Sequence, residues 1–135
     1  MIFLDTGAFV ARYIRHDAEH RRAKRAWAEI DRTGSRCLTS SFVLDEAFTL
    51  LGRRASYAFA ADRARALLGS KALTVLRPDA DDELKAVELF AKFADQRVSF
   101  TDCVSFVLMR RHRLERAFTF DRHFVAAGFE VTPRP

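Results

Sequence analysis

Residues 2–7 read IFLDTG, which is three apolar residues followed by an acid and two small residues. An apolar run this short is typical of a buried strand in a parallel sheet and not of a helix. Similar short runs occur at residues 37–38, 73–76, 117–120 and 129–131. Helical patterns separate these runs, at residues 6–14, 18–31, 41–53, 57–69, 81–95, 101–112 and 122–127. Strands that alternate with helices predict an α/β fold, a three-layer α/β/α sandwich around a short-stranded, mainly parallel central sheet.

The composition is that of one folded domain. The chain has 135 residues, of which 49% are hydrophobic and 30% are charged, and it is too apolar to be disordered. We therefore expect a single domain over residues 1–135. No stretch approaches the ~20 apolar residues of a membrane helix, and no basic segment precedes the first apolar run. Cys37 and Cys103 belong to no metal-binding pattern, so we expect free thiols and a cytoplasmic protein with no membrane contact.

The net charge favours a polyanionic partner. Lys and Arg number 23 against 18 acids, which gives a formal charge of +5 and an isoelectric point near 9.8. Such a surplus suits RNA, but many basic proteins do not bind nucleic acid. The charge becomes informative only together with a site.

Two acids follow predicted strands. Asp5 ends the first strand and Asp121 ends the fourth. Because ligands of such sheets bind outside the carboxyl ends of the strands, we expect both carboxylates at one edge of the sheet. The alternative is that each Asp caps the helix that follows it, which is a common use of this residue.

Glu46 stands out on the helix predicted for residues 41–53. It shares a helical face with Phe42, Val43 and Leu50, the side that we expect to face the core. Acids are rarely buried without a partner. The neighbouring Asp45 points about 100° away and can be solvated, so Glu46 is the functional candidate of the pair.

A fourth acid, Asp102, ends the segment SFTD at residues 99–102 and precedes an apolar helix. The spacing from Ser99 to Asp102 fits a capping box, so a purely structural role is an open alternative. The two roles are compatible, because a helix N-terminus also favours the ionised carboxylate that a metal needs.

Four acids gathered at one edge would repel each other. Two carboxylates ~5 Å apart oppose one another by roughly 3 kcal/mol at an effective dielectric constant of ~20, so such a cluster favours binding of a divalent cation. Oxygen ligands favour Mg²⁺ or Mn²⁺ over zinc. Magnesium on carboxylates is typical of phosphoryl chemistry, and an acidic metal pocket in a basic protein indicates a nuclease.

In four places the sequence resembles the PIN-domain ribonucleases and, among them, the VapC-type toxins of bacterial toxin–antitoxin pairs. The motifs are DTG at residues 5–7, TSS at residues 39–41 with Glu46 on the helix that follows, RVSFTD at residues 97–102 and TFDRHF at residues 119–124. Each motif alone is weak. Their order and separation make the resemblance specific, and it covers essentially the whole chain.

The resemblance implies Mg²⁺-dependent endonucleolytic cleavage of RNA, with Mn²⁺ as a substitute ion. It implies an acidic quartet that serves as both catalytic and metal-binding residues, namely Asp5, Glu46, Asp102 and Asp121. It assigns supporting hydroxyls that order the metal or its waters, namely Thr6, Ser99 and Thr101. A cognate antitoxin and a homodimer are implied as well. Many relatives carry a further acid where this chain has His123, so we expect one firmly held metal.

Three other functions start from similar residues. An aspartyl-phosphate phosphatase usually needs a second Asp two residues after the first, where this chain has Gly7, and a receiver domain needs a Lys after a strand, which is not found. The serious rival is a non-catalytic PIN-like module that binds RNA or protein. Four retained acids argue against that module. The sequence leaves open which RNA is cut, because recognition of unpaired bases depends on loop shape.

Overall fold

A five-stranded parallel sheet forms the centre of the computed structural model, which describes all 135 residues. The sheet order is β3-β2-β1-β4-β5, and every neighbouring pair is parallel. The strands are β1 (Ile2–Leu4), β2 (Cys37–Ser40), β3 (Leu73–Leu76), β4 (Arg116–Phe118) and β5 (Glu130–Thr132). The predicted short-stranded parallel sheet is confirmed.

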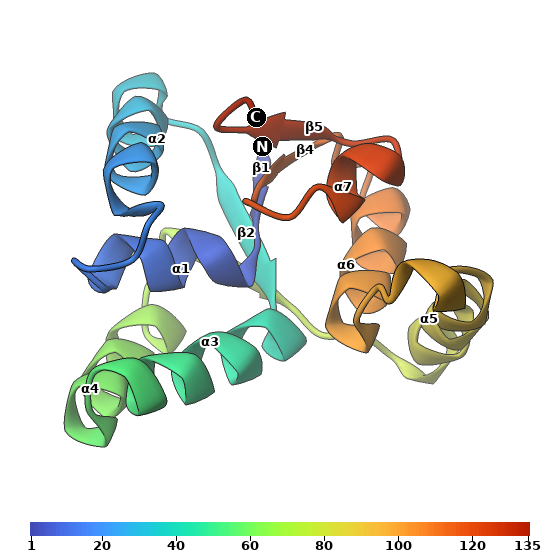
Figure 1. Cartoon of the computed structure of the whole chain (residues 1–135), viewed down its shortest axis with the longest axis horizontal. Helices are drawn as coiled ribbons and strands as arrows, with labels where there is room; N and C mark the ends of the chain where they lie inside the picture. Colours follow the sequence, from blue (N-terminus) through green and yellow to red (C-terminus); the bar gives the residue numbers. More distant parts are fainter.

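Helices cover both faces of this sheet. They are α1 (Thr6–Tyr13), α2 (His20–Thr33), α3 (Ser41–Arg54), α4 (Tyr57–Leu68), α5 (Ala80–Lys92), α6 (Phe100–Arg111) and α7 (His123–Ala126), with a 3₁₀ turn at Ala94–Gln96. Figure 1 shows α1 to α4 on one side of the strands and α5 to α7 on the other. The predicted three-layer α/β/α sandwich is therefore confirmed. No helix is both long and apolar enough to cross a membrane.

The strand order creates a crevice beside β1. The chain runs outward from β1 to β2 and β3, and then returns past β1 to form β4. The connection that follows β1 and the connection that follows β4 therefore run toward opposite edges of the sheet. A crevice opens between them at the carboxyl ends of β1 and β4. Any side chain that follows β1 or β4 lies at this crevice.

Local sequence explains where the helices begin. Ser40, Ser56 and Ser99 each accept a hydrogen bond from the backbone N–H three residues ahead, at 3.1 Å in each case. Serine at this position satisfies one of the free N–H groups of the first helical turn. Gly34 ends α2 in the left-handed conformation, with φ 66°, which glycine adopts without steric cost.

The core lies between the sheet and its helices, and aromatic rings fill much of it. Phe106 packs edge-on against Phe124, with ring centroids 4.9 Å apart, on the α6 side. Trp27 of α2 packs on Phe118 of β4 at 5.4 Å and donates its indole N–H to the Ala8 carbonyl at 2.9 Å. These contacts tie α1 and α2 to the strands that carry the crevice.

The fourth strand ends earlier than the sequence pattern predicts. The expected run continued to residue 120, but β4 ends at Phe118. The hydroxyl of Thr119 is bonded to the side chain of Asp5 and to the backbone of Asp121, so the chain turns there. Asp121 therefore lies three residues beyond the strand, on the turn that leads into α7.

Candidate metal centre

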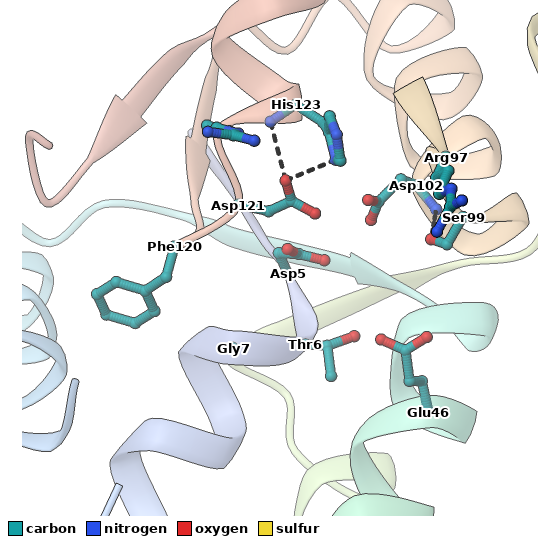
Figure 2. Close-up of a pocket in the computed structure, with 11 residues that line it drawn as sticks. Asp5, Thr6, Gly7, Glu46, Arg97, Ser99, Asp102, Phe120, Asp121 and His123 are labelled. Atoms are coloured by element: carbon teal, nitrogen blue, oxygen red, sulfur yellow. Dashed lines mark hydrogen bonds and ion pairs between the residues drawn. The ribbon is translucent and has the colours of Figure 1, made fainter. Parts of the chain in front are cut away.

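An acidic pocket of about 670 Å³ opens at the carboxyl ends of β1 and β4. All four predicted acids line it, and they come from four separate segments of the chain. Figure 2 shows their carboxylates turned toward a common space. The lining residues are Asp5, Thr6, Gly7, Glu46, Arg97, Ser99, Asp102, Phe120, Asp121, Arg122 and His123.

Asp5 sits at the floor of the pocket and is only 5% exposed. It stands at the N-cap of α1, but its side chain makes no capping hydrogen bond. The capping alternative is therefore wrong for Asp5. Its carboxylate accepts a hydrogen bond from the Thr119 hydroxyl at 2.7 Å instead. Burial raises the pKa of Asp5 to about 6, and the hydrogen bond from Thr119 opposes this rise.

Asp102 enters the pocket from the first turn of α6. Its backbone N–H donates to the Ser99 hydroxyl at 3.1 Å, which is the first half of the predicted capping box. The second half is missing, because the Asp102 carboxylate turns into the pocket (Figure 2). Burial, followed by the negative charge of Asp5, raises the pKa of Asp102 to about 9. In the absence of a cation this carboxyl group holds a proton at neutral pH.

Asp121 belongs both to a turn and to the pocket. Its Oδ1 accepts a hydrogen bond from the backbone N–H of His123 at 2.8 Å, so the capping alternative is partly right for this residue. Burial acts to raise the pKa of Asp121, but interaction with the protonated Asp102 carboxyl and with His123 outweighs burial and lowers it. Asp102 and Asp121 therefore share one proton unequally, and Asp121 carries the charge.

Glu46 reaches the pocket from α3 and is half-buried. The prediction that it faces the core is wrong, because the buried face of α3 carries Val43, Leu44 and Ala47. Glu46 lies at the margin of that face, where α3 passes the end of the sheet and the pocket opens. Asp45 is exposed and lies outside the pocket, as predicted.

The three predicted hydroxyls separate in the structure. Thr6 lines the pocket, is 7% exposed, and has no hydrogen-bond partner for its Oγ1. Ser99 also lines the pocket, although its hydroxyl is occupied as the cap of α6. Thr101 does not line the pocket, because the helical turn carries it to another side of α6. The structure therefore does not bring Thr101 together with the four acids, and its supporting role stays a prediction.

Thr119 and two arginines were not predicted from the sequence. Thr119 is 2% exposed and connects the Asp5 carboxylate to the backbone N–H of Asp121. Arg97 and Arg122 are exposed and lie on the pocket lining. Arg97 has φ 55°, which is rare for a residue with a side chain. That conformation cannot be read from the sequence, whereas a threonine just after a buried strand is a visible signal for Thr119.

The donor set fits a divalent cation. Ligand atoms of Asp102, Asp121 and His123 all lie within 4.8 Å of one another, and Asp5 and Glu46 add further carboxylates to the same pocket. Burial, with a further contribution from the neighbouring carboxylates, raises the pKa values of Asp5 and Asp102, and a bound cation would favour the ionised form of both groups. The unpartnered Thr6 hydroxyl offers a further oxygen for a metal or its water. Such a centre can polarise a phosphate and activate water.

The comparisons with known proteins agree with this geometry. The PIN domain family matches residues 2–130. The chain is 40% identical over 134 residues to the 23S rRNA-specific endonuclease VapC20 of Mycobacterium tuberculosis. This aligned region covers 98% of this chain and 99% of the relative. The match has the same identity and coverage in two strains of that organism.

Solved structures give the same result. The crystal structure of Mycobacterium tuberculosis VapC20, described as a Sarcin-Ricin loop cleaving toxin, matches with a TM-score of 0.86 and 37% identity over 96% of each chain. A DNA-bound VapBC from Salmonella typhimurium matches with a TM-score of 0.66 over 97% of each chain. Its identity is 18%, so this second likeness bears on the fold alone.

Proposed function

This chain belongs to the PIN-domain family, and we propose that it is a metal-dependent endoribonuclease that acts as the toxin of a toxin–antitoxin pair. One observation carries the proposal. Four carboxylates from four chain segments line one pocket at the crevice of the sheet, in a chain 40% identical over nearly its full length to an RNA endonuclease. Residues 1–135 act as a single nuclease domain, which the match over residues 2–130 supports.

Asp5, Glu46, Asp102 and Asp121 would hold the ion. Their oxygen ligands suit Mg²⁺, with Mn²⁺ as a substitute. When bound, the ion supplies positive charge at the scissile phosphate and lowers the pKa of the attacking water.

The residues around the carboxylates prepare the site. Thr119 fixes the orientation of the Asp5 carboxylate through its 2.7 Å hydrogen bond. Asp102 holds a proton at neutral pH and would release it to solvent on binding of a cation, because the cation would then neutralise the carboxylate in place of the proton. Arg97 and Arg122, at the pocket lining, are placed to pair with phosphates that flank the scissile bond.

The substrate that we propose is ribosomal RNA, in the class that the relative cleaves. The positive net charge of +5 supports binding to a polyanion of this kind. As a VapC-type toxin the chain would be held inactive by a cognate antitoxin, would form a homodimer and would act in the cytoplasm. A PIN-like module that binds RNA without cutting it is the alternative, and the complete acidic quartet favours the nuclease.

Mapping of cleavage sites on total RNA and on intact ribosomes tests the proposal. Purified protein with Mg²⁺ should produce a discrete cut in 23S rRNA, and EDTA should abolish the cut. A discrete cut in another RNA would contradict the proposed substrate but not the nuclease activity. RNA that is bound but left intact, with Mg²⁺ or with Mn²⁺, would instead favour the non-catalytic module.

A further inference from the structure

His123 brings an imidazole into the acidic pocket. Its Nδ1 lies 2.9 Å from Oδ1 of Asp121. One possible ligand atom from each of His123, Asp121 and Asp102 lies within 4.8 Å of the other two. Figure 2 shows the ring beside Asp121, facing the space that the carboxylates share. The pocket therefore offers one nitrogen ligand among its oxygens.

The Nδ1 atom of His123 is buried, and its one near partner in the protein is Oδ1 of Asp121 at 2.9 Å. The contact between these two atoms lacks hydrogen-bond geometry. Oδ1 of Asp121 already accepts the backbone N–H of His123 at 2.8 Å. Buried polar atoms without partners are rare and call for an explanation such as an ion. The Thr6 hydroxyl, on the opposite side of the same pocket and nine-tenths buried, is unpartnered too.

We infer that Nδ1 of His123 is a ligand of the divalent ion together with Asp102 and Asp121, and that this nitrogen raises the affinity of the centre for Mn²⁺ relative to its affinity for Mg²⁺. The inference deepens the proposed function and rests on its metal site. Neighbouring ligands of an octahedral ion lie about 3 Å apart, which fits the separation of Nδ1 and Oδ1. Imidazole binds first-row transition metals well, whereas Mg²⁺ strongly prefers oxygen and water.

The remaining three histidines cannot supply this nitrogen. His16 and His112 are exposed and lie outside the pocket lining. The ring of His20 is hydrogen-bonded through Nδ1 to the Ala11 carbonyl at 2.7 Å, and His20 does not line the pocket. A nitrogen found on the bound metal would therefore belong to His123.

Pulsed electron paramagnetic resonance of Mn²⁺ bound to the full chain tests the inference, because the spectrum reports coupling to a directly bound nitrogen. The wild-type protein should show this coupling, and His123→Asn should lose it. Calorimetric titration at one fixed pH should give a dissociation constant for Mn²⁺ roughly tenfold or more below that for Mg²⁺. His123→Asn and His123→Asp should both reduce the ratio of the Mg²⁺ dissociation constant to the Mn²⁺ dissociation constant. His123→Asp should bind Mg²⁺ at least as tightly as wild type.

His16→Gln is the matched control and should leave both the nitrogen coupling and the ratio unchanged. Circular dichroism checks that each variant is folded. Mn²⁺ bound without nitrogen coupling, or coupling that persists in His123→Asn, would overturn the inference while leaving the proposed nuclease intact. A wild-type protein that binds no divalent ion would overturn this inference and the proposed metal dependence together.

Discussion

The Thr119 hydroxyl donates a 2.7 Å hydrogen bond to Oδ2 of Asp5, which joins the ends of two neighbouring strands 114 residues apart in the chain. The same oxygen accepts the backbone N–H of Asp121 at 3.0 Å. One buried side chain thus sets the position of two of the four carboxylates.

Replacing Thr119 with Val keeps its shape but removes both hydrogen bonds. We expect Thr119→Val to lower RNA cleavage about 10- to 100-fold, the range typical of residues that orient metal ligands. Because the hydrogen bond from Thr119 lowers the pKa of Asp5, its loss should also move the pH profile of metal binding to higher pH. Calorimetric titration at several pH values measures this shift. Thr119→Ser should retain the wild-type profile, and an unshifted profile in Thr119→Val would argue for a packing role only.

Neutralising Asp102 should stabilise the metal-free protein at alkaline pH. The pKa of Asp102 is raised from 3.8 to about 9 on folding, so the folded state binds the proton more tightly than the unfolded state. The free energy of unfolding therefore falls as the pH rises from about 4 to about 9. Asp102→Asn removes this loss, and the expected gain at pH 8 is on the order of 2 kcal/mol, or several degrees in Tm.

Thermal melting in EDTA at pH 5 and pH 8 measures this gain. The variant should exceed wild type more at pH 8 than at pH 5, and Asp45→Asn should show no such difference. An advantage of equal size at both pH values would mean that the Asp102 carboxyl is not held neutral in the fold.

The two adjacent acids of α3 should behave differently. Glu46 lines the pocket and Asp45 is exposed to solvent. Glu46→Gln should weaken metal binding and cleavage by tenfold or more, whereas Asp45→Asn should leave both unchanged. A cleavage assay with a metal titration on both variants decides the matter. If Asp45 were the essential residue, α3 would have to present a different side to the pocket.

Arg97 should contribute to RNA binding through charge. Its exposed guanidinium lies at the pocket lining. Arg97→Gln in an Asp5→Asn background, which prevents cleavage, should weaken RNA binding and reduce the slope of log affinity against log salt by about 1. Fluorescence polarisation across a salt series measures the slope. Arg53→Gln, at an exposed arginine outside the pocket, is the control, and equal slopes in the two variants would exclude a phosphate contact by Arg97.

The sequence predicts the fold well because its apolar runs are separated by clear helical patterns. Asp5, directly after an apolar run, could be placed at the carboxyl edge of the sheet by this logic. The Thr119–Asp5 hydrogen bond could not be predicted, since it depends on the register that sets Leu4 beside Phe118. Strand register between distant segments is not visible in local periodicity.

The role of helical faces was harder to predict. Glu46 shares a face with apolar residues in the sequence, yet it lies at the margin of the buried face because α3 extends past the end of the sheet. Thr101 lies one residue before a pocket acid, and a rotation of about 100° along the helix carries it out of the pocket. Periodicity fixes the angle between residues, but not which angle meets the pocket.

Cleavage of 23S rRNA by wild type and by Asp5→Asn, under single-turnover conditions and across a titration of Mg²⁺ and of Mn²⁺, tests the central claim most directly. Asp5 is buried at the pocket floor and makes no capping bond, so its amide variant should fold while losing the charge that the metal needs. We expect metal-dependent cleavage by wild type, none in EDTA, and a loss of at least 100-fold in Asp5→Asn. Equal cleavage by the two proteins, or cleavage that survives EDTA, would contradict the metal centre described for this chain.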